Sequence, residues 1–202
     1  MEDRGDWQWI EGGRLVVCAF DPGIRTGWAW YDVDRVDMCS LGTRGGLKAA
    51  DTEWGTFDTS KGERYHVDQM VAVTRAAWAW AKVNPDRDTF IVTIEDFILQ
   101  NPSMDRELLA PVRLTARYLD RMETSGIAIW TRTTASEAKR TVTDERLRLW
   151  NQYDSSEGTH ARDAKRHAIL MLRKYASDLG FRSWAGVGLP YKREEQDVSE
   201  AS

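Results

Sequence analysis

The protein has 202 residues, enough for a single domain with its own core, and 28 Lys and Arg against 32 Asp and Glu give it a formal net charge of -4. Its 42% hydrophobic and 30% charged residues are typical of a soluble globular protein and exclude disordered, collagen-like and membrane-spanning classes. The acidic N-terminus lacks the features of a signal peptide, and two cysteines are too few for a disulfide scaffold. We therefore expect a cytoplasmic protein with no membrane partner.

Both ends of the chain are acidic, and we expect them to lie outside the folded domain. Residues 1–13 carry four acids against one arginine and are predicted to form a flexible arm, and residues 191–202 are predicted to form a disordered acidic tail. One domain is expected between them, over residues 14–190. Without the two ends the net charge is +1, and residues 106–175 alone carry +5. The overall acidity therefore does not exclude a nucleic-acid partner.

The region between the ends is predicted to be an α/β domain, because three strands are followed by alternating helices and strands. An apolar run ends at Asp21-Pro22-Gly23, which is typical of a buried strand that enters a turn. A polar stretch over residues 34–53 is predicted to be an extended turn. The predicted strands cover 14–20, 26–31, 54–59, 89–94 and 127–131, and the predicted helices cover 62–82, 105–124, 136–142, 143–150 and 160–177.

Acidic residues follow the two strands that are predicted to be most buried. Asp21 follows the first strand and Glu95 follows strand 89–94, so their carboxylates meet at one edge of the sheet if these strands are neighbours. On the last helix, His160, Asp163 and His167 lie within about 60° of one another.

Three carboxylates and an imidazole at one point repel each other unless a cation is bound, and this ligand set suits Mg²⁺ or Mn²⁺. Two such ions can hydrolyse a phosphodiester, so the pattern predicts a nuclease. Each residue also has a simpler interpretation: Asp21 as a turn residue, Glu95 as a solvated strand end, Asp163 as a partner in surface ion pairs. His167 is interpreted as a helix-face or supporting residue.

Four segments together resemble a known family. They are CAFDPGIRTGWAWYD (18–32), FIVTIEDF (90–97), ASEAKRTVTDERL (135–147) and HARDAKRHAILMLRKY (160–175), in the family's order. The sequence is similar to the RuvC family of Holliday-junction resolvases, and most similar to the RuvC-like resolvases of phages that infect actinobacteria.

The resemblance implies an RNase H-like fold, with a five-stranded mixed sheet in the order 3-2-1-4-5 and helices on both faces. It implies two Mg²⁺ or Mn²⁺ ions per active site, held by Asp21, Glu95, Asp163 and His160, where His160 stands at a position that is Asp in many relatives. Lys139 matches a lysine that contacts the substrate phosphate. Further substrate-binding candidates are Arg140, Arg146, Arg148 and Phe97, of which Phe97 is equally well interpreted as a core residue.

The implied activity is symmetric cleavage of four-way DNA junctions during recombination or replication, which needs a homodimer with two facing sites. In the predicted second helix, Leu108, Leu109, Val112, Ala116 and Leu119 form the expected core stripe. Leu114, Tyr118 and Met122 lie off this stripe and are predicted to contribute to the dimer surface.

Three alternatives stay open. A nuclease of the same fold could act on forks, flaps and branched DNA generally, because junction selectivity depends on dimer geometry. A noncatalytic junction-binding protein could keep the fold without hydrolysis. The DxGxxTG signature also resembles the phosphate loop of actin, Hsp70 and sugar-kinase ATPases, but those proteins need two such lobes, so we expect no nucleotide cofactor.

Overall fold

The computed structural model describes residues 14–34, 51–57, 61–83, 88–97, 109–123 and 129–177. The predicted arm, the predicted tail and most of the predicted turn over 34–53 lie outside these residues. The expected domain limits of 14–190 therefore stay a prediction. No helix in the described ranges is long and apolar enough to cross a membrane.

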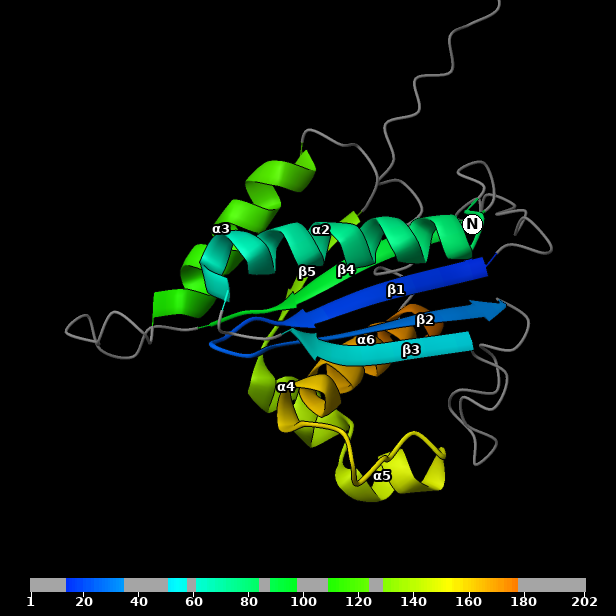
Figure 1. The fold of residues 1–202 in the computed structure, drawn as a ribbon. Coiled ribbons are helices and arrows are strands. Elements are labelled where there is room, and N and C mark those ends of the chain that lie inside the picture. The colour runs from blue at the N-terminus through cyan, green and yellow to red at the C-terminus, as the bar shows by residue number, and fades with distance from the viewer. Residues whose placement is uncertain are drawn as a thin grey trace, which may run out of the picture.

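A five-stranded mixed sheet forms the centre of the fold (Figure 1). Its order is β3-β2-β1-β4-β5, as predicted. β1 pairs antiparallel with β2 and parallel with β4, while β3 and β5 pair with β2 and β4 as the outer strands. The strands are β1 Arg14–Asp21, β2 Thr26–Asp34, β3 Asp51–Phe57, β4 Thr89–Glu95 and β5 Ile129–Thr133.

The first hairpin is longer than predicted. β2 continues to Asp34 because it stays paired with β1 as far as Arg14, and β3 starts at Asp51 because it pairs with Asp32. The sequence does not distinguish these polar strand ends from a loop, because pairing with a neighbouring strand decides where such strands end.

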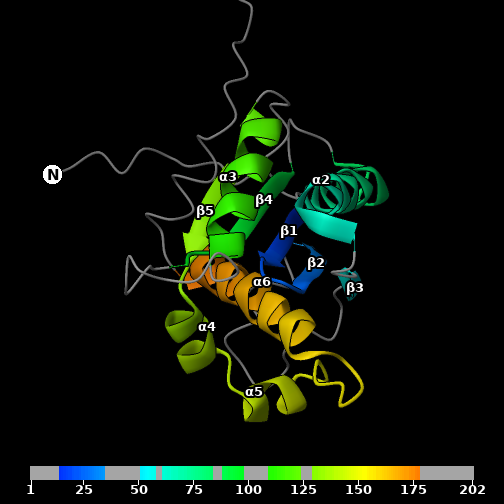
Figure 2. The ribbon, with the colours of Figure 1, turned by 60° about the vertical axis from the view of Figure 1, so that its left-hand side comes forward.

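Helices cover both faces of the sheet (Figure 2). One face carries α2 and α3, and the other carries α6 with the two short helices α4 and α5. Alternate residues of β1 face the two layers, so this strand is buried on both sides. The helices are α2 Gly62–Trp80, α3 Ala110–Glu123, α4 Ala135–Thr141, α5 Asp144–Leu149 and α6 Thr159–Ser177.

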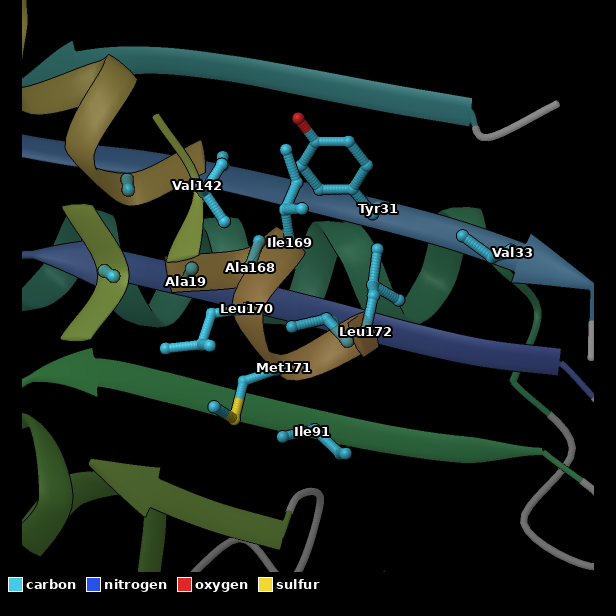
Figure 3. Close-up of a cluster of buried hydrophobic side chains, with 14 of the residues drawn as sticks. Ala19, Tyr31, Val33, Ile91, Val142, Ala168, Ile169, Leu170, Met171 and Leu172 are labelled. Carbon is cyan, nitrogen blue, oxygen red and sulfur yellow. The ribbon is translucent and has the colours of Figure 1, made fainter. Parts of the chain in front are cut away.

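α6 lies against the middle of the sheet, and its buried residues pack with those of β1, β2 and β4 (Figure 3). Ala164 and Ala168 are fully buried on this helix, and such small side chains let the helix backbone come close to the strands. The first turn of α6 therefore reaches the edge of the sheet where β1 and β4 end.

The predicted core face of α3 is wrong. Its buried residues are Ala110, Leu114, Tyr118 and Met122, whereas Ala116 is exposed. The Tyr118 hydroxyl hydrogen-bonds Thr74 of α2 at 2.5 Å, and the Tyr118 ring packs edge-on against Phe20 of β1. Since Leu114, Tyr118 and Met122 fill the core, they cannot form the predicted dimer surface.

The error has a physical cause, because α3 carries apolar residues on more than one side and a helical period fits both. Packing against α2 and the sheet decides between them, and ion pairs with α2 accompany it. Arg113 and Arg117 of α3 both pair with Glu63, and Arg121 pairs with Asp68. These long-range contacts cannot be read from helical spacing.

Candidate active site

Asp21 and Glu95 lie next to each other at the carboxyl end of the sheet. Their strands run parallel with Phe20 opposite Ile94, which brings the following two acids to the same edge. The two carboxyl groups are close enough for each to influence the pKa of the other. The prediction that they meet is confirmed.

α6 brings an imidazole and a third carboxylate to this edge. His160 Nδ1 lies 2.7 Å from Asp21 Oδ2. The charge of Asp163 acts on Asp21, Glu95 and His160, so it belongs to the same cluster. The four residues predicted as metal ligands are therefore brought together.

The close approach of α6 depends on the first hairpin. A Cβ added at Gly27 of β2 would lie 2.0 Å from the His160 carbonyl oxygen and 2.6 Å from the Ala161 nitrogen. Only glycine leaves room for the helix backbone here. The glycine of the DPGxxTG segment thus explains how His160 reaches Asp21.

The two neighbouring acids have opposite pKa shifts. Burial raises the pKa of Asp21 to about 6, and the hydrogen bond from His160 only partly offsets this. Burial also acts to raise the pKa of Glu95, but the hydrogen bond and charge of His167 outweigh it and leave that pKa below its usual value. The pKa of His160 is raised, chiefly by its hydrogen bond to Asp21. The directions of these pKa shifts make Asp21 and His160 hold a proton more readily, and Glu95 less readily, than they would in the unfolded chain.

Lys139 pairs with Asp163 of this cluster, while its predicted contact with a substrate phosphate stays a prediction. It lies on α4, which starts at a Thr134 cap whose hydroxyl accepts the Glu137 N–H at 3.2 Å. Its Nζ is 3.0 Å from Asp163 Oδ2, and its side chain is about half exposed. Because the Lys139 ammonium group is exposed and lies next to the carboxylate cluster, it can contact the phosphate of a ligand that approaches from solvent.

For the other predicted substrate-binding residues, the structure gives no contact with the carboxylate cluster within the described ranges. Arg140 of α4 and Arg146 and Arg148 of α5 are exposed, and Arg148 lies over the Tyr153 ring. α5 begins at a Thr143 cap, whose hydroxyl accepts the Arg146 N–H. Phe97 is half buried two residues beyond Glu95. Their roles toward a substrate stay predictions.

Two neighbours of the cluster were not among the predicted site residues, although His167 was interpreted as a helix-face or supporting residue. His167 Nε2 lies 3.0 Å from Glu95 Oε2, and Arg166 forms a fork between Asp163 and Asp144 while its Nε donates to the Val142 carbonyl at 3.1 Å. His167 stands seven residues after His160, which puts both imidazoles on one side of α6. That spacing was the available signal.

The donor set fits a divalent cation in its chemistry. Asp21 is a buried carboxyl group next to the partly buried carboxyl group of Glu95, and a cation between them would offset the repulsion of their charges. Among the described residues, no group of three or more such side chains is already arranged around a metal position. The two oxygens of Asp163 pair with Arg166 and Lys139, so a cation bound to Asp163 would compete with the exposed Lys139.

The strand order, the parallel β1–β4 pair and the helices on both faces define an RNase H-like fold. Within this class, the chain is similar to RuvC of Thermus thermophilus, with 13% identity over 79% of this chain and 94% of that chain and a TM-score of 0.51. The same enzyme in complex with a Holliday junction substrate gives 10% identity over the same shares and a TM-score of 0.48. No protein-family model matches the sequence, and no curated protein matches it.

Proposed function

We propose that this protein is a metal-dependent endonuclease that hydrolyses phosphodiester bonds in branched DNA, with the four-way junction as its preferred substrate. The observation that carries this proposal is the pair of adjacent carboxyl groups, Asp21 and Glu95, with an imidazole beside them. The Nδ1 atom of His160 on α6 lies 2.7 Å from Asp21 Oδ2. The shared fold with RuvC is consistent with it.

Asp21, Glu95, Asp163 and His160 would hold Mg²⁺ or Mn²⁺, most simply two ions per site. Bound cations of this kind activate a water molecule and stabilise the leaving oxygen of a phosphodiester. Asp21 and Glu95 supply oxygens from the sheet, while Asp163 supplies one from α6. His160 either completes the ligand set or takes the proton of the attacking water.

Lys139 has a second role in this proposal. In the structure it neutralises Asp163 at 3.0 Å, and its exposed side chain can turn to a DNA phosphate. A fixed cation next to the scissile phosphate stabilises the negative charge that develops there. The same movement frees an oxygen of Asp163 for a cation.

We propose that the active form is a homodimer, because symmetric cleavage of a four-way junction needs two sites related by a two-fold axis. Sedimentation velocity tests this. We expect a dimer in the presence of junction DNA, and monomer alone, with and without DNA, would contradict it. The narrower resemblance to phage resolvases and the cytoplasmic location stay predictions.

The substrate is tested with matched four-way junction, replication fork, flap and linear duplex, each with Mg²⁺ or Mn²⁺. We expect paired, symmetric nicks confined to the junction. Equal cleavage of forks and flaps would instead show a broader branched-DNA nuclease. Tight junction binding without any cleavage would show a noncatalytic junction-binding protein.

A further inference from the structure

His167 is a buried imidazole that contacts the site through Glu95. Its side chain is 1% exposed, and its two ring nitrogens lie 3.0 Å from Glu95 Oε2 and 2.6 Å from Thr133 Oγ1. Because both nitrogens are engaged and the ring is inaccessible, His167 is not a metal ligand itself. Its contact is with a residue that we propose as a ligand.

Both ring nitrogens of His167 are hydrogen-bonded. An ionised carboxylate only accepts, so Nε2 donates to Glu95, while Nδ1 pairs with the Thr133 hydroxyl, which can both donate and accept. Thr133 Oγ1 lies 3.2 Å from the hydroxyl of Thr93, which can donate in turn. These hydrogen bonds link Thr93 of β4 and Thr133 of β5 through His167 to Glu95, and they hold the imidazole ring in one orientation.

The two histidines of α6 are therefore used differently. His160 is partly exposed at the first turn and hydrogen-bonds Asp21, whereas His167 is fully buried two turns later and hydrogen-bonds Glu95. An exposed imidazole can bind a cation or exchange a proton, while a buried imidazole with both nitrogens occupied can only hold its neighbour in place.

We propose that His167 is a positioning residue that holds the Glu95 carboxylate in the orientation needed to bind a divalent cation, with Thr133 fixing the imidazole. This inference rests on the proposed use of Glu95 as a metal ligand. Hydrogen bonds that orient a ligating carboxylate typically change metal affinity or activity by about 10–100-fold when removed. The helix residue thereby preorganises a strand-end ligand that β4 alone would leave free to rotate.

The test measures Mn²⁺ binding without any DNA, by following free Mn²⁺ with electron paramagnetic resonance. His167→Leu removes the hydrogen bond and is expected to weaken Mn²⁺ binding by about 10–100-fold. His167→Gln, whose amide can donate near the position of Nε2, is expected to recover most of the affinity. Tyr118→Phe is the matched control, because it removes a buried hydroxyl on the opposite face of the sheet and should bind Mn²⁺ like the wild type.

Thr133→Val keeps the test decisive if His167→Leu fails to fold, since it removes only the partner of Nδ1. An intermediate loss of Mn²⁺ affinity in this variant supports the proposal. Wild-type affinity in a folded His167→Leu or Thr133→Val protein would overturn it, as would a wild-type protein that binds no Mn²⁺. Mn²⁺ binding that depends on His167, in a protein that cleaves none of the DNA substrates, would instead refute only the proposed nuclease.

Discussion

Gly27 lies directly beneath the backbone of His160. A Cβ at Gly27 would fall 2.0 Å from the His160 carbonyl oxygen, closer than any real contact, so β2 and α6 touch without an intervening side chain. This contact links the first hairpin to the helix that carries the imidazole and the third carboxylate of the site.

Gly27→Ala should therefore push the start of α6 away from the sheet. We expect a loss of about 3 kcal/mol in the free energy of unfolding, at the upper end of the usual cost of overpacking, together with loss of cleavage. Urea unfolding and junction cleavage measure the two effects. Gly158→Ala is the control, because its Cβ would meet only Thr56 at 3.6 Å. Equal stability of the two variants would show that α6 adjusts freely.

Asp21→Asn tests the centre of the proposed site. Asparagine keeps the shape but loses the charge that holds a cation, so cleavage should fall by at least about 100-fold, the scale on which single catalytic electrostatic groups act. Junction binding without metal should stay at the wild-type level in a gel-shift titration. Asp120→Asn, an exposed carboxylate on α3, is the control. Cleavage by Asp21→Asn at the wild-type rate would remove Asp21 from the mechanism.

The raised pKa of Asp21 predicts how stability depends on pH. Between the usual pKa of 3.8 and the folded pKa of about 6, the folded protein holds the proton that the unfolded chain releases, so this group lowers stability as pH rises. Above that window the ionised group costs about 1–3 kcal/mol. Asp21→Asn should therefore be more stable than the wild type at pH 8, with the difference vanishing near pH 4.

Urea unfolding at both pH values, without divalent cations, measures this difference. A variant that is less stable than the wild type at pH 8 would contradict the cost of burying the Asp21 charge. Added Mn²⁺ should stabilise the wild type more than the variant, because a cation bound to Asp21 stabilises only the folded state.

Arg166 joins α6 to the segment between α4 and α5. It is buried, its fork pairs with Asp163 and Asp144, and its Nε donates to the Val142 carbonyl. Arg166→Met leaves these acceptors without their partner, and we expect a loss of about 3–5 kcal/mol in stability. Arg166→Lys should recover only part of it, because an ammonium cannot replace the guanidinium fork.

Urea unfolding measures the stability of the Arg166 variants. Arg75→Met, at an exposed position of α2, is the control. If Arg166→Lys were as stable as the wild type, a single charge rather than the fork would hold these helices together.

The exposed arginines of α5 predict how DNA binding depends on salt. If Arg146 and Arg148 each contact a phosphate, replacing both with Gln should reduce the slope of log affinity against log salt by about 1–2 units. Junction affinity measured over a series of salt concentrations tests this, with Arg75→Gln as the control. An unchanged slope would place the DNA elsewhere. Because the charge of residues 106–175 is only +5, we also expect duplex binding to be weaker than junction binding.

The order of the elements and the two strand-end acids could be predicted from the sequence. Apolar β-branched runs that end in Asp21 and Glu95 are local sequence patterns, and such patterns predict strands without knowledge of the fold. The fold class then follows, since few arrangements suit three strands followed by alternating helices and strands.

Helical spacing alone could not predict that His160 and Asp163 lie near these acids. Their helical spacing puts them on one side of α6, but the contact itself depends on Gly27, which lies more than 130 residues earlier in the chain. The resemblance to RuvC pointed to the same residues by a different route.

By itself, then, the sequence determined the order of the elements along the chain, the strand-end acids and the helix that faces them, because these depend on periodicity and on the turns that end each run. The strand order within the sheet was implied only by the resemblance to the RuvC family. Only the tertiary structure decided that Leu114, Tyr118 and Met122 of α3 are buried, because two apolar sides of one helix differ only in what packs against them. The same holds for the contacts of His167 and Arg166: the sequence left His167 as a helix-face or supporting residue and did not single out Arg166, and both meet their partners on other elements only in the fold.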